Sequence, residues 1–446
     1  MIAKSISLVH GTAGLAKIVR QNRAGQAVGI FSICSANRQV LEAGIAQAKR
    51  NDSLLLIEST SNQVNQFGGY TGQTPADFAK FVRELAGELQ FPAERLILGG
   101  DHLGPHVWRK EPAVDAMAKG CAMVRDYVRA GFTKIHLDAS MHCADDEGDR
   151  HKPLDEEIVS ARAAELCKAA EEAHQELPAG SEAPLYVIGT EVPIPGGEQA
   201  EFIAPETTRP ADLTRTLESA RQAFRARDLD AAWERVIAVV VQPGVEFGDS
   251  NVYTYDSAKT VELSDTLMRN WTGVFEAHST DYQTSSALKQ MVVDHFAILK
   301  VGPWLTFAFR EAIFGLAAIE NEWLGARVSL KLSQVCEALE NAMIANPVYW
   351  KDHYHGDEES LRIARQFSYS DRARYYWPNP EVQAAIQRLI ANLHSNPAPI
   401  SLISQYLPTQ AGQIRDGRLR NEPLELIQSK ILEVLDGYAF ACGMKT

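Results

Sequence analysis

Eight short apolar segments alternate with helix-like segments before about residue 320, and this alternation constrains the fold more than any other feature. Each apolar segment is a continuous run, which is typical of strands buried on both faces of a parallel sheet. The segments between them carry apolar residues at helical spacing, as Val40, Leu41 and Ile45 do in the segment 37–50. The predicted strands are residues 27–33, 53–58, 96–98, 134–138, 185–191, 235–242, 273–278 and 295–302.

Eight alternating strand and helix units predict a TIM barrel. An open doubly wound sheet is the alternative, but it often has fewer strands and a glycine-rich first turn, and no G-x-G-x-x-G motif follows the first predicted strand. Beyond Phe307 the sequence predicts only helices, joined by aromatic-rich loops such as 375–378 that we expect to serve packing. We therefore predict an α/β fold with a TIM (β/α)8 barrel, residues 1–325, and an all-helical C-terminal extension, residues 326–446, packed on the barrel.

Composition excludes several classes of partner. The 446 residues carry a formal net charge of −13, which argues against a nucleic-acid-binding face. None of the six cysteines forms a C-x-x-C pair, which favours free thiols in a reducing compartment over a disulfide framework. No apolar run reaches the roughly 18 residues of a membrane span, and the first residues lack the apolar core of a secretory signal. We expect a cytoplasmic protein without nucleic-acid or membrane partners.

Polar side chains gather where the predicted strands end. The third strand runs into the sequence Gly99–Pro105, which places Asp101 and His102 side by side before a Gly-Pro turn. Burying an unpaired charge costs several kcal/mol, so a core gains nothing from such groups. In α/β barrels the carboxyl ends of the strands form the active site. The polar residues at these ends are Ser35, Asn37, Arg38, Glu58, Asp101, His102, Asp138, Glu191, Gln242, Glu276, His278, Asp281 and Lys300.

His102, Glu191 and His278 follow three different strands, so a barrel would direct them toward one centre. Two histidines and one carboxylate match a catalytic Zn²⁺ with an open position for substrate. Such a metal could polarise a carbonyl, and Asp101 could move a proton to or from a hydroxyl. The alternative is a metal-free pocket in which these residues only satisfy one another's hydrogen bonds. The candidates for binding substrate are Asp138, Gln242, Glu276, Asp281 and Lys300.

Three motifs together resemble the Z-type (GatZ/KbaZ) subunit family of D-tagatose-1,6-bisphosphate aldolase: residues 99–105, 191–198 and 371–378. The resemblance runs from about residue 30 to the C-terminus. It implies a TIM barrel with a helical extension, related to the class II metal-dependent aldolases. It also implies carbohydrate metabolism, in the breakdown of tagatose, galactitol or N-acetylgalactosamine, where the Z-type protein supports a catalytic Y-type aldolase subunit. Members have also been labelled tagatose-6-phosphate kinase, and some relatives are sugar 4-epimerases.

The resemblance assigns roles to individual residues. Asp101 and His102 look like the catalytic Asp and the first metal-binding His of the class II aldolases, Glu191 like their carboxylate position, and His278 like their last metal-binding His. Asp138 looks like their Asp-Gly-Ser strand end. Three features depart from that pattern.

The sixth-strand His of the aldolases has no counterpart, and Gln242 is the nearest polar residue. Residues 279–282 replace the Gly-Gly-Ser that grips a phosphate, and Asp281 would repel a phosphate there. The Asn-x-Asp of the eighth strand is replaced by residues 300–303, which begin with Lys300. Binding of a bisphosphate in the aldolase manner is therefore in question.

The sequence leaves three functions open. The first is an accessory subunit that supports a Y-type class II aldolase. The second is a metal-dependent aldolase or 4-epimerase that acts on a ketohexose or ketohexose phosphate by retro-aldol chemistry, with a divalent metal, expected to be zinc. The third is a tagatose-6-phosphate kinase, for which the sequence holds no P-loop motif. Self-association is compatible with all three.

Overall fold

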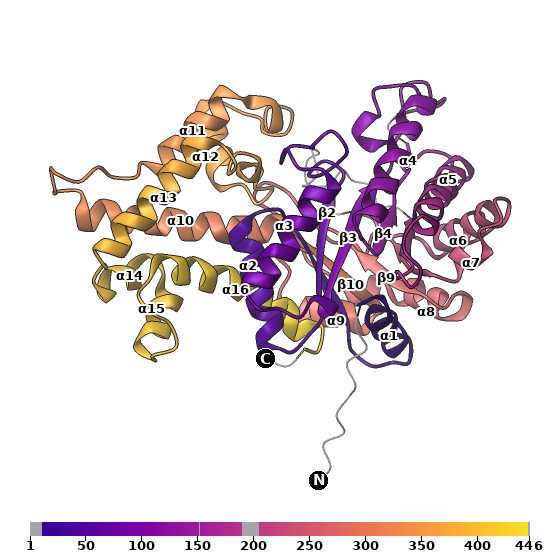
Figure 1. The fold of residues 1–446 in the computed structure, drawn as a ribbon, viewed down its shortest axis with the longest axis horizontal. Coiled ribbons are helices and arrows are strands. Elements are labelled where there is room, and N and C mark those ends of the chain that lie inside the picture. Colours follow the sequence, from indigo (N-terminus) through magenta and orange to yellow (C-terminus); the bar gives the residue numbers. More distant parts are fainter. Residues whose placement is uncertain (1–10, 151, 190–204, 445–446) are drawn as a thin grey trace, which may run out of the picture.

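The computed structural model describes residues 11–150, 152–189 and 205–444, and its centre is a closed barrel of eight parallel strands (Figure 1). Each strand pairs with its neighbour in the sequence, and β1 pairs with β10 to close the barrel. This confirms the predicted fold. The barrel strands are β1 (Ile30–Cys34), β2 (Leu55–Thr60), β3 (Leu96–Leu103), β4 (Lys134–Leu137), β5 (Leu185–Gly189), β6 (Val236–Val240), β9 (Val274–Ala277) and β10 (Phe296–Val301).

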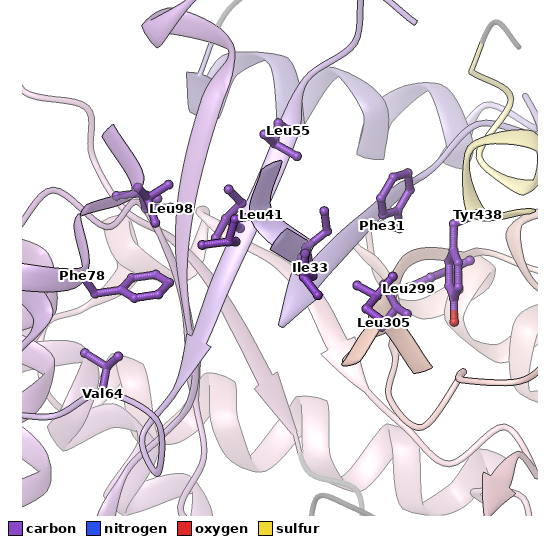
Figure 2. Packing of buried hydrophobic residues seen from close by; sticks show 14 of the residues in the cluster. Phe31, Ile33, Leu41, Leu55, Val64, Phe78, Leu98, Leu299, Leu305 and Tyr438 are labelled. Atoms are coloured by element: carbon purple, nitrogen blue, oxygen red, sulfur yellow. The ribbon is translucent and has the colours of Figure 1, made fainter. Parts of the chain in front are cut away.

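Helices cover the outside of the barrel because each strand buries apolar side chains on its outer face. At Gly44 a Cβ atom would lie only 2.3 Å from Ile33 Cδ1, so this glycine lets the first covering helix lie close to β1. Ile33 and Leu41 lie together in the resulting apolar layer (Figure 2). The helices of this layer are α2 (Arg38–Arg50), α3 (Pro75–Glu88), α4 (Ala113–Arg129), α5 (Glu156–Gln175), α6 (Pro210–Arg225), α7 (Asp230–Trp233), α8 (Val261–Asn270) and α9 (Ser285–Val293).

The two ends of the barrel interior differ in chemistry. Near the N-terminal ends of the strands the interior is apolar, with Ile30, Leu56 and Ile298 in one buried cluster. The helix α1 (Gly11–Arg23) closes this end by adding Leu15 and Val19 to that cluster. Helix α1 was not among the elements predicted from the sequence. Because apolar side chains fill the interior near the N-terminal ends of the strands, the polar groups of the strands are confined to the carboxyl ends.

The helix that follows the last barrel strand, α10 (Pro303–Leu324), runs outward from the barrel and carries the helical extension (Figure 1). The last helix, α16 (Pro423–Ala441), returns and packs against α2, α9 and α10. On α16 the Tyr438 ring lies 5.8 Å from the Phe31 ring of β1, and its hydroxyl donates to Thr280 O at 2.8 Å (Figure 2). The extension is therefore tied to the barrel at both of its ends. Its remaining helices are α11 (Val335–Ala345), α12 (Glu358–Phe367), α13 (Pro380–Ser395), α14 (Ile400–Tyr406) and α15 (Pro408–Arg415).

Local details differ from the sequence expectation. The helix expected from residue 329 begins at Val335, because Gln334 has a φ of 52° and Glu320 accepts hydrogen bonds from both Ser333 N and Ser333 Oγ. After β6 the chain adds a short antiparallel pair, β7 (Glu246–Phe247) and β8 (Val252–Tyr253). All six cysteines lie in the described ranges and are free, as expected. Every helix among the described residues is too short or too polar to cross a lipid bilayer.

Candidate active site

A bulge in β3 presents Asp101 and His102 to the barrel interior. Pairing with β4 shifts by one residue between Gly100 and Leu103, and His102 has a φ of 49°. A bulge of this kind redirects side chains next to active sites. Upstream of the bulge, a Cβ atom on Gly99 would lie 2.7 Å from Glu58 Cγ, so the glycine leaves room for a carboxylate side chain from β2. The two glycines before the Asp-His pair therefore have a packing role.

Three buried imidazoles face one another at the carboxyl end of the barrel. His102 lies 4.9 Å from His136 of β4 and 4.8 Å from His278, and His136 lies 5.2 Å from His278, all between ring centroids. Potential ligand atoms of these three residues and of Asp101 all lie within 4.8 Å of one another. His136 was not among the predicted site residues. The sequence pattern that could have identified it is the alternation of Lys134, His136 and Asp138 with apolar residues, because this two-residue spacing places all three side chains on the inner face of β4.

Each imidazole has a hydrogen-bonding partner, and His136 Nδ1 also accepts from the His102 backbone amide at 3.2 Å. His102 Nδ1 lies 2.7 Å from Asp138 Oδ2, and Asp138 Oδ1 accepts from the backbone and hydroxyl of Ser140 at 3.0 and 2.7 Å. His278 Nε2 lies 3.1 Å from Glu276 Oε1, and His136 Nε2 donates to a backbone carbonyl of β5 at 3.2 Å. Partners of this kind fix the ring and tautomer of metal-binding histidines.

The charge states of the cluster suit a cation. Burial lowers the pKa of His278 to about 3, so its imidazole is neutral, which is the form in which histidine binds a metal. Burial alone would raise the pKa of Asp101, but His102 and Lys300 hold it well below its usual value. Burial alone would lower the pKa of His102, but Asp101 and Asp138 raise it above its usual value, so a metal would displace a proton from this imidazole. Deprotonated imidazoles and ionised carboxylates are ligands of zinc and of other divalent metals. The residues present therefore fit a divalent metal at this position.

Below the imidazoles lies a buried ionic network. Lys134 Nζ lies 2.6 Å from Glu58 Oε1 and 2.7 Å from Glu276 Oε2, and all three side chains are fully buried. Lys300 Nζ lies 2.7 Å from Asp101 and 3.4 Å from Glu276, and it also pairs with Glu58. Burial would lower the pKa of Lys300, but Asp101 and the other acidic groups around it raise it well above its usual value. Lys300 therefore stays protonated.

Two of the predicted substrate ligands, Gln242 and Asp281, accept hydrogen bonds from backbone amides. Gln242 Oε1 accepts from the amides of Gly244 and Val245 at 2.8 and 3.1 Å and fixes the turn after β6. Asp281 Oδ1 accepts from the amides of Gly302 and Trp304 at 3.0 and 2.8 Å, at the N-terminus of α10. Burial raises the pKa of Asp281 to about 6.

Of the residues predicted for the site, the structure brings together Asp101, His102, Asp138, Glu276, His278, Asp281 and Lys300. Glu191 lies outside the described residues. Its predicted role as a metal ligand therefore stays a prediction.

A cavity opens directly above the cluster. Its volume, measured as the space open to the centres of water-sized molecules, is about 100 Å³. Asp101, His102, His278 and Lys300 contribute to its wall from the barrel side. Tyr70, from the loop after β2, and Arg374 and Tyr375, from the helical extension, also line it.

Comparison with known proteins identifies the family. The sequence model described as "D-tagatose-1,6-bisphosphate aldolase subunit GatZ/KbaZ-like" matches residues 15–443. The chain belongs to this family. A protein from Sinorhizobium meliloti 1021, whose crystal structure is described as that of a probable tagatose 6 phosphate kinase, is 44% identical, with a TM-score of 0.84 over 93% of this chain and 100% of that chain. A fructose-bisphosphate aldolase from Campylobacter jejuni is 14% identical, with a TM-score of 0.46 over 87% of this chain and 95% of that one.

Membership in the GatZ/KbaZ-like family confirms the resemblance drawn from the three sequence motifs. It connects the chain to carbohydrate metabolism related to tagatose-bisphosphate aldolase. Within this family assignment, the buried histidine and aspartate cluster is compatible with a metal site.

Proposed function

We propose that this chain is a divalent-metal-dependent enzyme that cleaves or epimerises a ketohexose or ketohexose phosphate by retro-aldol chemistry. One observation carries the proposal: three imidazoles and a carboxylate converge on the floor of an open cavity, and two of the imidazoles are backed by buried carboxylates. His102, His136 and His278 would hold the metal, with Asp101 beside it, and zinc is the expected ion for a nitrogen-rich ligand set. Bound there, the metal would polarise the substrate carbonyl as a Lewis acid.

The side chains around the cluster supply the remaining functions. In a retro-aldol step, a base removes the proton of the hydroxyl on the carbon two positions from the carbonyl, and the hydroxyl oxygen becomes the carbonyl oxygen of an aldehyde. The bond between that carbon and the carbon next to the original carbonyl breaks, and its electron pair forms an enolate whose negative charge rests on the original carbonyl oxygen. Asp101 is ionised and lines the cavity, so it can accept that proton. The ammonium of Lys300 faces the same cavity and can stabilise negative charge that develops on oxygen. Epimerisation follows when the bond reforms on the other face of the released aldehyde.

Lys300 does not support a Schiff-base mechanism. A Schiff-base lysine must lose its proton to act as a nucleophile, which requires a lowered pKa. Glu58, Asp101 and Glu276 instead surround Lys300, and its pKa is raised. The position of this lysine therefore supports metal-assisted rather than imine chemistry.

Metal analysis followed by a substrate screen tests the proposal. The purified protein should contain about one divalent metal per chain, and it should convert at least one ketohexose or ketohexose phosphate in a reaction that chelators abolish. His102→Ala, His136→Ala and His278→Ala should each lose the metal. His394→Ala, which changes an exposed histidine on α13, is the matched control and should keep it. Absence of metal together with unchanged thermal stability in chelator would rule the proposal out.

The accessory role is the second candidate, and the family description as an aldolase subunit favours it. In this case the chain would bind a Y-type class II aldolase and raise its activity or lifetime. Co-expression with that aldolase should then give co-purification and a longer half-life of activity. The His102→Ala variant separates the two candidates, because an accessory role alone would survive loss of the metal cluster.

A further inference from the structure

A short turn of the helical extension reaches the cavity above the imidazole cluster. The turn is the 3₁₀ helix Arg372–Tyr375. Its Tyr375 ring lies 4.7 Å from the Tyr70 ring of the loop after β2 and 4.8 Å from the Tyr349 ring, between centroids. These aromatic contacts join the extension to the barrel loop at the rim of the cavity. Tyr375 therefore packs, as expected for the aromatic loops, and also lines the site.

The turn is anchored to α10 by a buried carboxylate. Asp371 has a φ of 45°, and its Oδ2 accepts from Thr306 Oγ1 at 2.5 Å. Its Oδ1 lies 3.5 Å from Arg310 Nε. Both partners belong to the helix that leaves β10. The position of Arg374 is consequently fixed relative to the imidazole cluster at the carboxyl end of the barrel.

Arg374 is a cation whose contacts in the described part of the chain are all with neutral groups. Its guanidinium donates to the carbonyls of Ser370 and Asp371, the latter at 3.0 Å, and to the hydroxyl of Tyr375 at 2.9 Å. No carboxylate of the described residues lies at ion-pair distance from it. Lys300 is the other Lys or Arg side chain of the cavity wall, and acidic partners already surround it. Among the described residues, Arg374 is therefore the cation of the cavity wall that no carboxylate contacts at ion-pair distance, although Asp281 lines the same cavity and Asp371 lies on the same turn.

The usual phosphate position of an α/β barrel is taken by the protein itself. In TIM barrels a phosphate often binds to backbone amides after the last strands and at a helix N-terminus. Here the amides of Gly302 and Trp304 already donate to Asp281. A second anion at these amides would face the Asp281 carboxylate.

We propose that Arg374 binds the phosphate group of a ketose phosphate, so that the helical extension supplies the residue that selects a phosphorylated substrate. The inference rests on the proposed retro-aldol function for the identity of the sugar. A planar guanidinium suits a phosphate because it donates two parallel hydrogen bonds. The aromatic contacts of Tyr375 and the anchor at Asp371 hold the group in place before the ligand arrives.

Calorimetric titration of the zinc-loaded protein tests the inference without relying on turnover. Fructose 6-phosphate and fructose form a pair of probes that differ only in the phosphate, and tagatose 6-phosphate and tagatose form a second pair. The phosphorylated sugar of at least one pair should bind at least about 10-fold more tightly, the gain expected from hydrogen bonds to a charged group. Inorganic phosphate should compete with it. Equal affinities within each pair, or no binding of any probe, would overturn the inference.

Two variants assign the effect to Arg374. Arg374→Gln should weaken binding of the phosphorylated sugar by about 10- to 100-fold and leave the unphosphorylated sugar unchanged. Arg374→Lys keeps the positive charge but lacks the two parallel hydrogen-bond donors of a guanidinium, so it should restore part of the affinity. Arg388→Gln, which changes an arginine of α13 at a different cavity, is the matched control and should change nothing. A loss that is equal for both sugars would indicate a structural role and would contradict the inference.

The outcomes separate this inference from the proposed function. Binding that depends on both phosphate and Arg374, in a protein without turnover, would support the phosphate site and reject the enzyme. Turnover that is insensitive to the phosphate and to Arg374→Gln would support the enzyme and reject the phosphate site.

Discussion

Replacement of Lys134 by Met tests whether the buried ionic network at the carboxyl end of the barrel contributes to the free energy of unfolding. The ammonium of Lys134 is fully buried between Glu58 and Glu276, at 2.6 and 2.7 Å. Met has a similar length but no charge, so Lys134→Met creates little empty volume and leaves two buried carboxylates with Lys300 as their shared cation. Removing one partner of a buried ion pair costs about 3–5 kcal/mol. Because two carboxylates lose a contact, we expect the upper part of this range.

The measurement is equilibrium unfolding in urea, carried out on the metal-free protein so that metal binding does not contribute. Lys119→Met is the matched control. Lys119 lies 2.6 Å from Glu111, a distance equal to that of the buried pair, but both side chains are 36% exposed. An exposed pair contributes at most about 1 kcal/mol, so this control should be nearly neutral. The comparison isolates burial, because the ion-pair distance is the same in both cases.

A double-mutant cycle identifies the origin of the cost. Glu58→Gln removes one of the carboxylates that Lys134→Met leaves without its cation. If the destabilisation comes from uncompensated charge, the double variant should be more stable than the sum of the two single effects predicts, by about 1–3 kcal/mol. A cost for Lys134→Met no larger than that of Lys119→Met, or strict additivity in the cycle, would refute this reasoning.

Three further predictions concern the site, the anchor of the extension and a helix terminus. Asp138→Asn, which alters the partner of His102, should lower zinc affinity about 10- to 100-fold in chelator competition while the circular dichroism spectrum is unchanged. Burial raises the pKa of Asp371 to about 6, so the folded state binds its proton more tightly than the unfolded state. In acid and neutral denaturation series, wild type should therefore gain up to about 3 kcal/mol over Asp371→Asn as the pH falls from 7 to 4. Thr74→Ala removes the capping box of α3 and should cost about 1 kcal/mol in urea unfolding.

The sequence predicts the barrel well because its signal is local. A strand that is buried on both faces has to be a continuous apolar run, and each of the eight runs became a barrel strand. Asp101, His102 and His278 were found because they directly follow such runs. His136 and Lys134 were not selected, because they lie within an apolar strand rather than after it. Their two-residue spacing on β4 was the available signal for an inner polar face.

The contribution of the extension to the site could not be derived from local patterns. Arg374 lies far from β3 in the sequence, and its place at the cavity depends on how α10 leaves the barrel and on the contacts of Tyr375 with Tyr70. The same holds for Asp281, which sequence alone presents as a free carboxylate. In the structure Asp281 accepts two backbone hydrogen bonds, and this contact depends on the path of the chain between β9 and α10.

The architecture separates activation of the substrate from its selection. The groups that would polarise a carbonyl and move a proton lie on barrel strands and are held by one another, so changes to them affect stability and chemistry together. Arg374 lies on a turn whose anchors are in α10 and at the cavity rim, outside that network. Substitutions in this turn can therefore change which sugar binds without disturbing the buried ionic network. If Arg374 selects the phosphate, relatives that act on unphosphorylated ketoses should differ in this turn and retain the imidazole cluster.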